Sequence, residues 1–220
     1  MMTTITRRTG WLLITPGILT LLYVGYELWG TGLSARAAQH SLGRELQQEW
    51  STPSVAEAAT AQASPVDGQP IAILTVARLG AGYQEIVIEG TSTADLRKAP
   101  GHYPGTALPG QLGNFAVAGH RTTYGAPFGD LNLLRAGDII AIRVATTSYE
   151  YRVTGHEIVS PSENAVVAPT PDQPGTRPVR RMLTLTTCHP KYSANKRLVV
   201  HALLVAVRHA AVTVAPAVSG

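Results

Sequence analysis

Residues 182–208, MLTLTTCHPKYSANKRLVVHALLVAVR, contain two apolar runs separated by a short polar loop. In the first run Leu183 and Leu185 alternate with threonines, which is the two-residue period of a strand. Pro190 cannot donate a hydrogen bond to a sheet, so this strand should stop near Cys188. The second run is too short to cross a membrane and predicts a buried final strand.

The same pattern of short β-branched runs between glycines and prolines continues upstream to about residue 70. The predicted strands are 71–78, 84–89, 114–119, 138–145, 149–159, 182–188 and 198–208, with a weaker one near 165–168. Short helices are predicted near 92–98 and over 130–134, the latter with Asp130 as N-cap. Many short strands with few helices predict an all-β domain, closed as a barrel or packed as a sandwich.

The amino-acid composition argues against several classes of protein. A chain of 220 residues suits one domain with appendages. The net charge of +4 comes from scattered basic residues, so it gives no argument for nucleic-acid binding. The single cysteine, Cys188, excludes an intrachain disulfide framework and a cysteine-rich metal site.

Apolar residues dominate 11–29, WLLITPGILTLLYVGYELW, where Glu27 is the only charge. At about 1.5 Å per residue this helix would reach roughly 28 Å, close to the thickness of the hydrocarbon layer. Arg7 and Arg8 precede it, so the positive-inside rule predicts a transmembrane anchor with residues 1–10 in the cytoplasm. A cleaved signal peptide and a buried soluble helix are the alternatives.

Residues 30–69 are predicted to be an extracellular linker or stalk, with an amphipathic helix over 33–50, followed by a domain at 70–210 and a tail at 211–220.

A lone thiol in an exported protein, among basic residues and no acidic ones, favours a reactive thiolate at Cys188. The alternative is a small buried hydrophobe. His120 follows an apolar run and a glycine, which places it at a strand end suited to a proton carrier. A loop and a neighbouring antiparallel strand would bring Arg197 beside Cys188 for oxyanion stabilisation, although a surface arginine is the default interpretation.

These segments together resemble the sortases, the membrane-anchored cysteine transpeptidases of Gram-positive bacteria. The matching pieces are TLTTC at 184–188, AGH at 118–120 and Arg197, in the family's order. Three further stretches are most similar to the class E sortases of actinobacteria: YPGTA at 103–107, HRTTYGAPF at 120–128 and CHPKYSA at 188–194.

The resemblance implies an eight-stranded β-barrel over about 70–210 and a catalytic set of Cys188 as nucleophile, His120 as general acid/base and Arg197 as oxyanion stabiliser. It implies an LPxTG or LAxTG sorting signal cleaved between Thr and Gly, through a thioacyl enzyme, and joined to a peptidoglycan-precursor amine. Thr187 and Tyr124 are weaker candidates for substrate contact.

The expected partners are therefore secreted proteins with a C-terminal sorting signal, the cell-wall amine and the membrane. No cofactor is expected. No metal is expected either, because Glu157 and Glu163 are separated and form no acidic cluster like the calcium site of class A sortases. A pilin-polymerising sortase and an inactive, membrane-tethered peptide-binding module remain as alternatives. An L,D-transpeptidase is disfavoured because its Ser-x-Gly-Cys pattern is absent.

Overall fold

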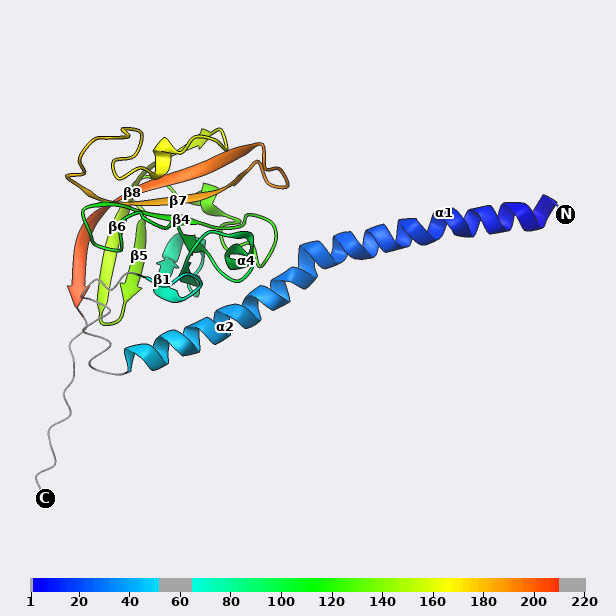
Figure 1. The fold of residues 1–220 in the computed structure, drawn as a ribbon, viewed down its shortest axis with the longest axis horizontal. Helices are drawn as coiled ribbons and strands as arrows, with labels where there is room; N and C mark the ends of the chain where they lie inside the picture. Colours follow the sequence, from blue (N-terminus) through cyan, green and yellow to red (C-terminus); the bar gives the residue numbers. More distant parts are fainter. Residues whose placement is uncertain (1, 52–64, 210–220) are drawn as a thin grey trace, which may run out of the picture.

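A computed structural model describes residues 2–51 and 65–209, which form a long helical arm and a β-barrel (Figure 1). The arm consists of α1 (Met2–Gly25), a π-helical turn η1 (Tyr26–Gly30) and α2 (Thr31–Trp50). Figure 1 shows α1 pointing away from the barrel, while α2 runs alongside it.

Eight strands close the barrel in the order β1-β2-β3-β4-β7-β8-β6-β5. Most neighbouring strands are antiparallel, but β2–β3 and β4–β7 pair in parallel. The strands are β1 (Pro70–Val76), β2 (Gln84–Glu89), β3 (Gly101–His102), β4 (Gly113–Ala118), β5 (Ile139–Val144), β6 (Thr147–Val159), β7 (Arg181–His189) and β8 (Lys196–His209). The connections contain a short helix α4 (Thr93–Leu96) and the 3-10 turns η2 (Ala77–Leu79), η3 (Leu131–Leu133) and η4 (Ala165–Val167).

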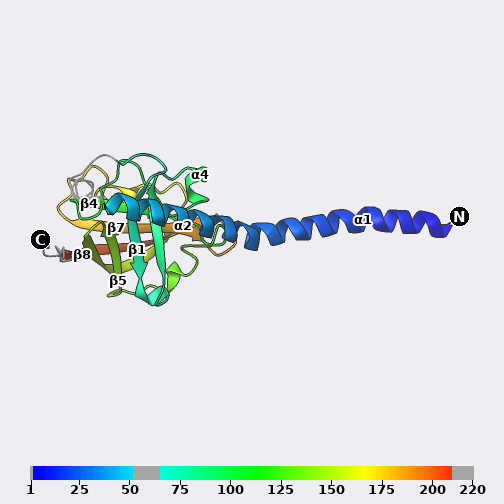
Figure 2. The same ribbon diagram turned by 90° about the horizontal axis from the view of Figure 1, so that it is seen from below.

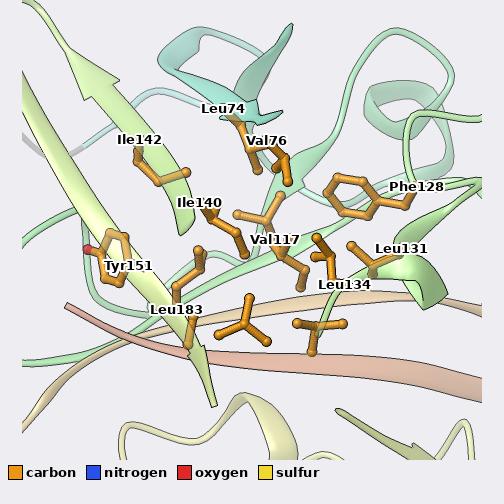
Figure 3. Close-up of a cluster of buried hydrophobic side chains, with 14 of the residues drawn as sticks. Leu74, Val76, Val117, Phe128, Leu131, Leu134, Ile140, Ile142, Tyr151 and Leu183 are labelled. Carbon is orange, nitrogen blue, oxygen red and sulfur yellow. The ribbon is translucent and has the colours of Figure 1, made fainter. Parts of the chain in front are cut away.

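Alternate residues of the strands fill the barrel interior (Figure 3). Leu74 and Val76 of β1 meet Val117, Ile140 and Leu183 from other strands, and all five are almost fully buried. Because successive side chains of a strand point to opposite faces, a closed barrel buries every second position of each strand.

Helix α2 covers the outer face of β1 and β2 (Figure 2). Leu42 and Leu46 pack there against Ile73, Ile86 and Ile88. This second cluster explains why β1 and β2 carry apolar residues on both faces, unlike a strand with one face in water.

The side-chain amide of Gln39 adds a polar link between α2 and β2. Its Nε2 donates to the carbonyl of Ile86 at 3.1 Å, and its Oε1 accepts from the amide of Ile86 at 2.7 Å. One glutamine thus satisfies both backbone groups of Ile86, which lies opposite Ile73 of β1 but precedes the residues of β2 that pair with β3.

The all-β barrel and seven of its strands are confirmed, but the predicted strand near 165–168 is wrong. That segment forms the 3-10 turn η4, in which Val167 N donates to Asn164 O at 3.2 Å. The eighth strand is instead β3, which has two residues and is too short for a periodic pattern to reveal. Residues 130–134 form a 3-10 turn, and the side chain of Asp130 does not cap it but binds Lys191.

The predicted transmembrane helix over 11–29 is not supported: within the described residues, no helix is both long and apolar enough to cross a bilayer. The observed helix begins at Met2 and therefore includes the polar stretch at 3–8, and it passes into η1 before residue 29. The amphipathic helix predicted over 33–50 lies within α2, and its packing on the barrel was not anticipated. Residues 52–64 and the predicted tail at 211–220 lie outside the described residues.

We predict that Leu46→Ala lowers the free energy of unfolding by about 2–5 kcal/mol, because this side chain is 1% exposed between α2 and the barrel. Leu33→Ala is the matched control, since Leu33 lies in the same helix but is 69% exposed. Chemical denaturation of both variants measures the difference. Equal stabilities would contradict the assigned packing of α2.

Candidate active site

Cys188 and Arg197 lie directly opposite each other on the antiparallel pair β7–β8. Directly opposed residues of such a pair present their side chains on the same face. The thiol is partly exposed, so it is not sealed in the core. The Arg197 guanidinium is held at the strand end, where Nη1 donates to the carbonyls of Ala194 at 3.0 Å and Lys196 at 3.1 Å.

His120 lies two residues after the end of β4, the parallel neighbour of β7. Ala118 pairs with Thr186, so His120 and Cys188 each stand two residues beyond that pair at the same barrel end. The pairing continues past the strand, because Gly119 N donates to Thr186 O at 3.1 Å. The Thr187 hydroxyl donates to Gly119 O at 2.8 Å.

Gly119 is required by the packing beneath His120. A Cβ at this position would lie 2.5 Å from the ring of Phe128. Phe128 N in turn donates to the carbonyl of His120 at 3.0 Å. The glycine therefore lets a core aromatic ring support the turn that presents the imidazole.

The His120 imidazole is partly desolvated and has a free nitrogen. Its Nε2 is buried and makes no hydrogen bond to any residue that the structure describes. Its ring packs on the ring of Tyr124 with centroids 4.9 Å apart. Burial lowers the pKa of His120 below 6.5, and the positive charge of Arg97 lowers it further. A largely neutral imidazole with an unused nitrogen is suited to exchanging a proton with a substrate.

Arg97 reaches this site from the short helix α4. Ser92 and Asp95 form a capping box that starts the helix. Arg97, directly after its end, then places its guanidinium 5.8 Å from the centroid of the Tyr124 ring. The arginine, the tyrosine and the imidazole thus form a contiguous stack beside the barrel end.

Arg121 is a functional candidate that sequence reasoning missed. It is 6% exposed, and its Nη1 donates to the carbonyl of Cys188 at 3.1 Å and to Nδ1 of His189 at 2.8 Å. Its Nη2 donates to Oδ1 of Asn132 at 2.9 Å. The residue next to His120 therefore fixes the backbone of the cysteine. Its position beside His120 was the available signal, but no local pattern indicates that an arginine is buried.

The two weaker candidates have different surroundings. Thr187 is 2% exposed and uses its hydroxyl on Gly119, so it ties β7 to β4 instead of facing an open surface. Tyr124 is partly buried and contacts His120.

His189 turns its Nδ1 to Arg121, and because a guanidinium only donates, this nitrogen must accept.

One group in the described chain has the spacing of a metal site, formed by Glu157, Asp172 and His201. Its ligand atoms lie within 4.8 Å of one another, and Glu157 Oε1 already contacts His201 Nε2 at 3.0 Å. His201 pairs with Thr184, four residues before Cys188, which is roughly 13 Å along the strand. The group is therefore separate from the cysteine, and the absence of a metal requirement stays a prediction.

One end of the barrel carries a thiol, an imidazole and a guanidinium, which together supply the groups that acyl transfer needs. The thiolate attacks a carbonyl, the imidazole carries the proton, and the guanidinium offers hydrogen-bond donors to the oxyanion.

We predict that Arg121→Lys lowers kcat/KM for the reaction at Cys188 by about 10–100-fold, because one ammonium cannot span three acceptors in fixed directions. Arg208→Lys is the control, since Arg208 makes a two-point contact with Glu150 at the other end of β8. Steady-state kinetics and thermal melting of both variants separate catalysis from folding. An Arg121→Lys enzyme with unchanged kinetics would contradict the positioning role.

We predict that Arg97→Gln raises the pKa of His120, because it removes a positive charge beside the imidazole. The pKa of His120 is lower in the folded protein than in the unfolded chain. As the pH falls below about 6.5, the unfolded chain takes up a proton that the folded protein does not, and the protein therefore loses stability. Arg97→Gln should lose less stability than the wild type over this acidic pH range. NMR titration of the His120 ring measures the pKa, with the exposed neighbour Lys98→Gln as control. An equal pKa in both variants would refute the assignment.

Comparison with known proteins finds the sortase domain over residues 74–205, a range that includes all three candidate residues. Sortase SrtE1 of Streptomyces coelicolor is 34% identical over 205 residues, covering 88% of this chain and 55% of that protein. The chain thus spans about half the length of that relative. The structure of sortase E from Streptomyces avermitilis is 42% identical with a TM-score of 0.60, covering 66% of this chain and 93% of that chain. Sortase E1 from Streptomyces coelicolor, solved with a tripeptide in its active site, is 35% identical with a TM-score of 0.60, covering 64% of this chain and 91% of that chain.

Proposed function

The chain belongs to the sortase family, and from that premise we propose that it is a cysteine transpeptidase of the class E type. It cleaves a C-terminal sorting signal of LAxTG or LPxTG type between Thr and Gly and joins the protein to a cell-wall amine. The observation that carries the proposal is the register at the barrel end, which sets Cys188 opposite Arg197 and beside the end of the strand that bears His120.

In the proposed first step, the Cys188 thiol gives its proton to His120. The resulting thiolate attacks the threonine carbonyl carbon, and the carbonyl oxygen becomes an oxyanion that accepts hydrogen bonds from Arg197. The carbon–nitrogen bond then breaks, and His120 donates a proton to the leaving glycine amine. In the second step the incoming amine attacks the thioester and gives up its proton to His120. The thiolate leaves, and the product is a new amide.

The class E assignment is supported by the similarity to sortase E from two Streptomyces species. The tripeptide in the active site of the Streptomyces coelicolor protein supports a peptide ligand for the corresponding surface of this chain. A pilin-polymerising enzyme and an inactive binding module are the competing functions. The partly exposed thiol and the unpaired imidazole nitrogen favour catalysis over binding alone.

The proposal also places the barrel outside the cell, held at the membrane by its N-terminal region. Supporting it are the exposed apolar side chains on α1, among them Leu12, Leu21 and Leu22, with Arg7 and Arg8 before them. Apolar surface of this kind favours a lipid environment over water.

We expect the full chain to stay with membranes after a high-salt wash and to be degraded when protease is added to intact protoplasts. A cytoplasmic protein in the same sample serves as the control for intact membranes. A barrel protected from protease, or found in the washed soluble fraction, would contradict this location.

We predict that Cys188→Ala abolishes transfer of an LAxTG peptide to an added amine, while the affinity for the peptide stays within about threefold. The thiol is the only group in the proposal that forms a bond to the acyl group. Mass spectrometry of the wild type, incubated with peptide and no amine, should show a peptide adduct on Cys188 that hydroxylamine removes. Turnover that survives the substitution, or a wild type that binds peptide without an adduct, would refute the enzyme assignment.

A further inference from the structure

The loop that follows His120 adopts an unfavourable backbone conformation. Tyr124, Gly125 and Ala126 have φ angles of 51°, 78° and 50°. Two of these three consecutive left-handed residues carry a Cβ, which disfavours the conformation. Such a loop persists only when its surroundings hold it in place.

The first turn of α2 supplies part of that support. The amide of Tyr124 donates to Oγ1 of Thr31 at 3.2 Å, and the same hydroxyl donates to the carbonyl of Glu27 at 2.7 Å. Thr31 is only 4% exposed. Its hydroxyl therefore links the arm to the loop at a site from which water is largely excluded.

Close packing beside Thr31 completes the contact. Ala35 is 4% exposed, and a Cβ built on Gly125 would lie 3.7 Å from the Cβ of Ala35. A Cβ built on Gly32 would lie 3.7 Å from the amide nitrogen of Gly125. Only small residues on α2 allow the helix to approach the loop this closely.

The contact between α2 and the loop is connected to His120 on one side and to the barrel on the other. Tyr124 packs its ring on His120, so a displacement of this residue also displaces a surface of the imidazole. Further along α2, Leu46 and Gln39 fix the helix to the barrel. The first turn of α2 is therefore a rigid support and not a free end.

We infer that Thr31 and Ala35 are positioning residues for His120: α2 holds the Tyr124–Ala126 loop in its left-handed conformation, and the loop holds the imidazole. This inference rests on the proposed function, because it concerns the rate of proton transfer in that reaction. It assigns to the N-terminal arm a role in catalysis beyond that of a spacer.

The steric test compares two alanines of the same helix in the full-length chain in detergent. Ala35→Leu introduces bulk at the loop contact, whereas Ala37→Leu makes the same change on the exposed face. We expect Ala35→Leu to lower kcat for LAxTG transfer at least tenfold, with KM for the peptide within twofold of wild type. Ala37→Leu should match wild type in both constants.

The hydrogen-bond test uses Thr31→Val, which keeps the shape and removes the acceptor, with Ser41→Ala on the exposed face as its control. Among residues 2–51 and 65–209, the hydroxyl of Ser41 bonds only to the carbonyl of Ala38. We expect Thr31→Val to lower kcat several-fold and to speed hydrogen–deuterium exchange over residues 121–128.

The outcomes separate this inference from the proposed function. A wild type with no transfer activity would refute the proposed function. Hydrogen–deuterium exchange over residues 121–128 in the four variants would still decide whether α2 supports the loop. If Ala35→Leu fails to fold, Thr31→Val decides alone. An active wild type whose Thr31→Val variant keeps full kcat and normal loop exchange would overturn the inference. A rise in kcat would overturn it too, because α2 would then restrain the site.

Discussion

The parallel pairing of β4 with β7 is the constraint on which the rest of the site depends. A parallel pair brings the carboxyl ends of both strands to one edge, so the residue that follows β4 and the last residues of β7 must emerge together. The antiparallel partner β8 then delivers Arg197 opposite Cys188. Three chemically different groups from distant segments come to one end of the barrel because the pairing register of these strands places them there.

The end of the barrel is held by polar contacts that cross between the strand ends. Arg121 connects the segment after β4 to the backbone of Cys188, and Thr187 connects β7 back to Gly119. The Thr187 contact is buried and the Arg121 contact is partly buried. A buried polar group left without its hydrogen bond costs about 1–3 kcal/mol. The immediate sequence neighbours of Cys188 and His120 thus tie the two strand ends together.

Part of the N-terminal arm, α2, belongs to the domain as much as the strands do. Helix α2 covers apolar residues on the outer face of β1 and β2 that would otherwise face water. The same helix reaches the loop beside His120 through Thr31. One element therefore contacts both the outer face of β1 and β2 and the loop that follows His120.

The sequence by itself determined the β-class, seven of the strands and the three candidate residues, because two-residue periodicity and short motifs are local properties. It did not reveal β3, whose two residues are too few to show a period, or the burial of Arg121, which depends on Cys188 67 residues away. It predicted a helix over 33–50, but not that this helix packs on the barrel. Only the tertiary structure decided these points, because burial and partner choice arise when distant segments meet, and no local pattern records which segments those are.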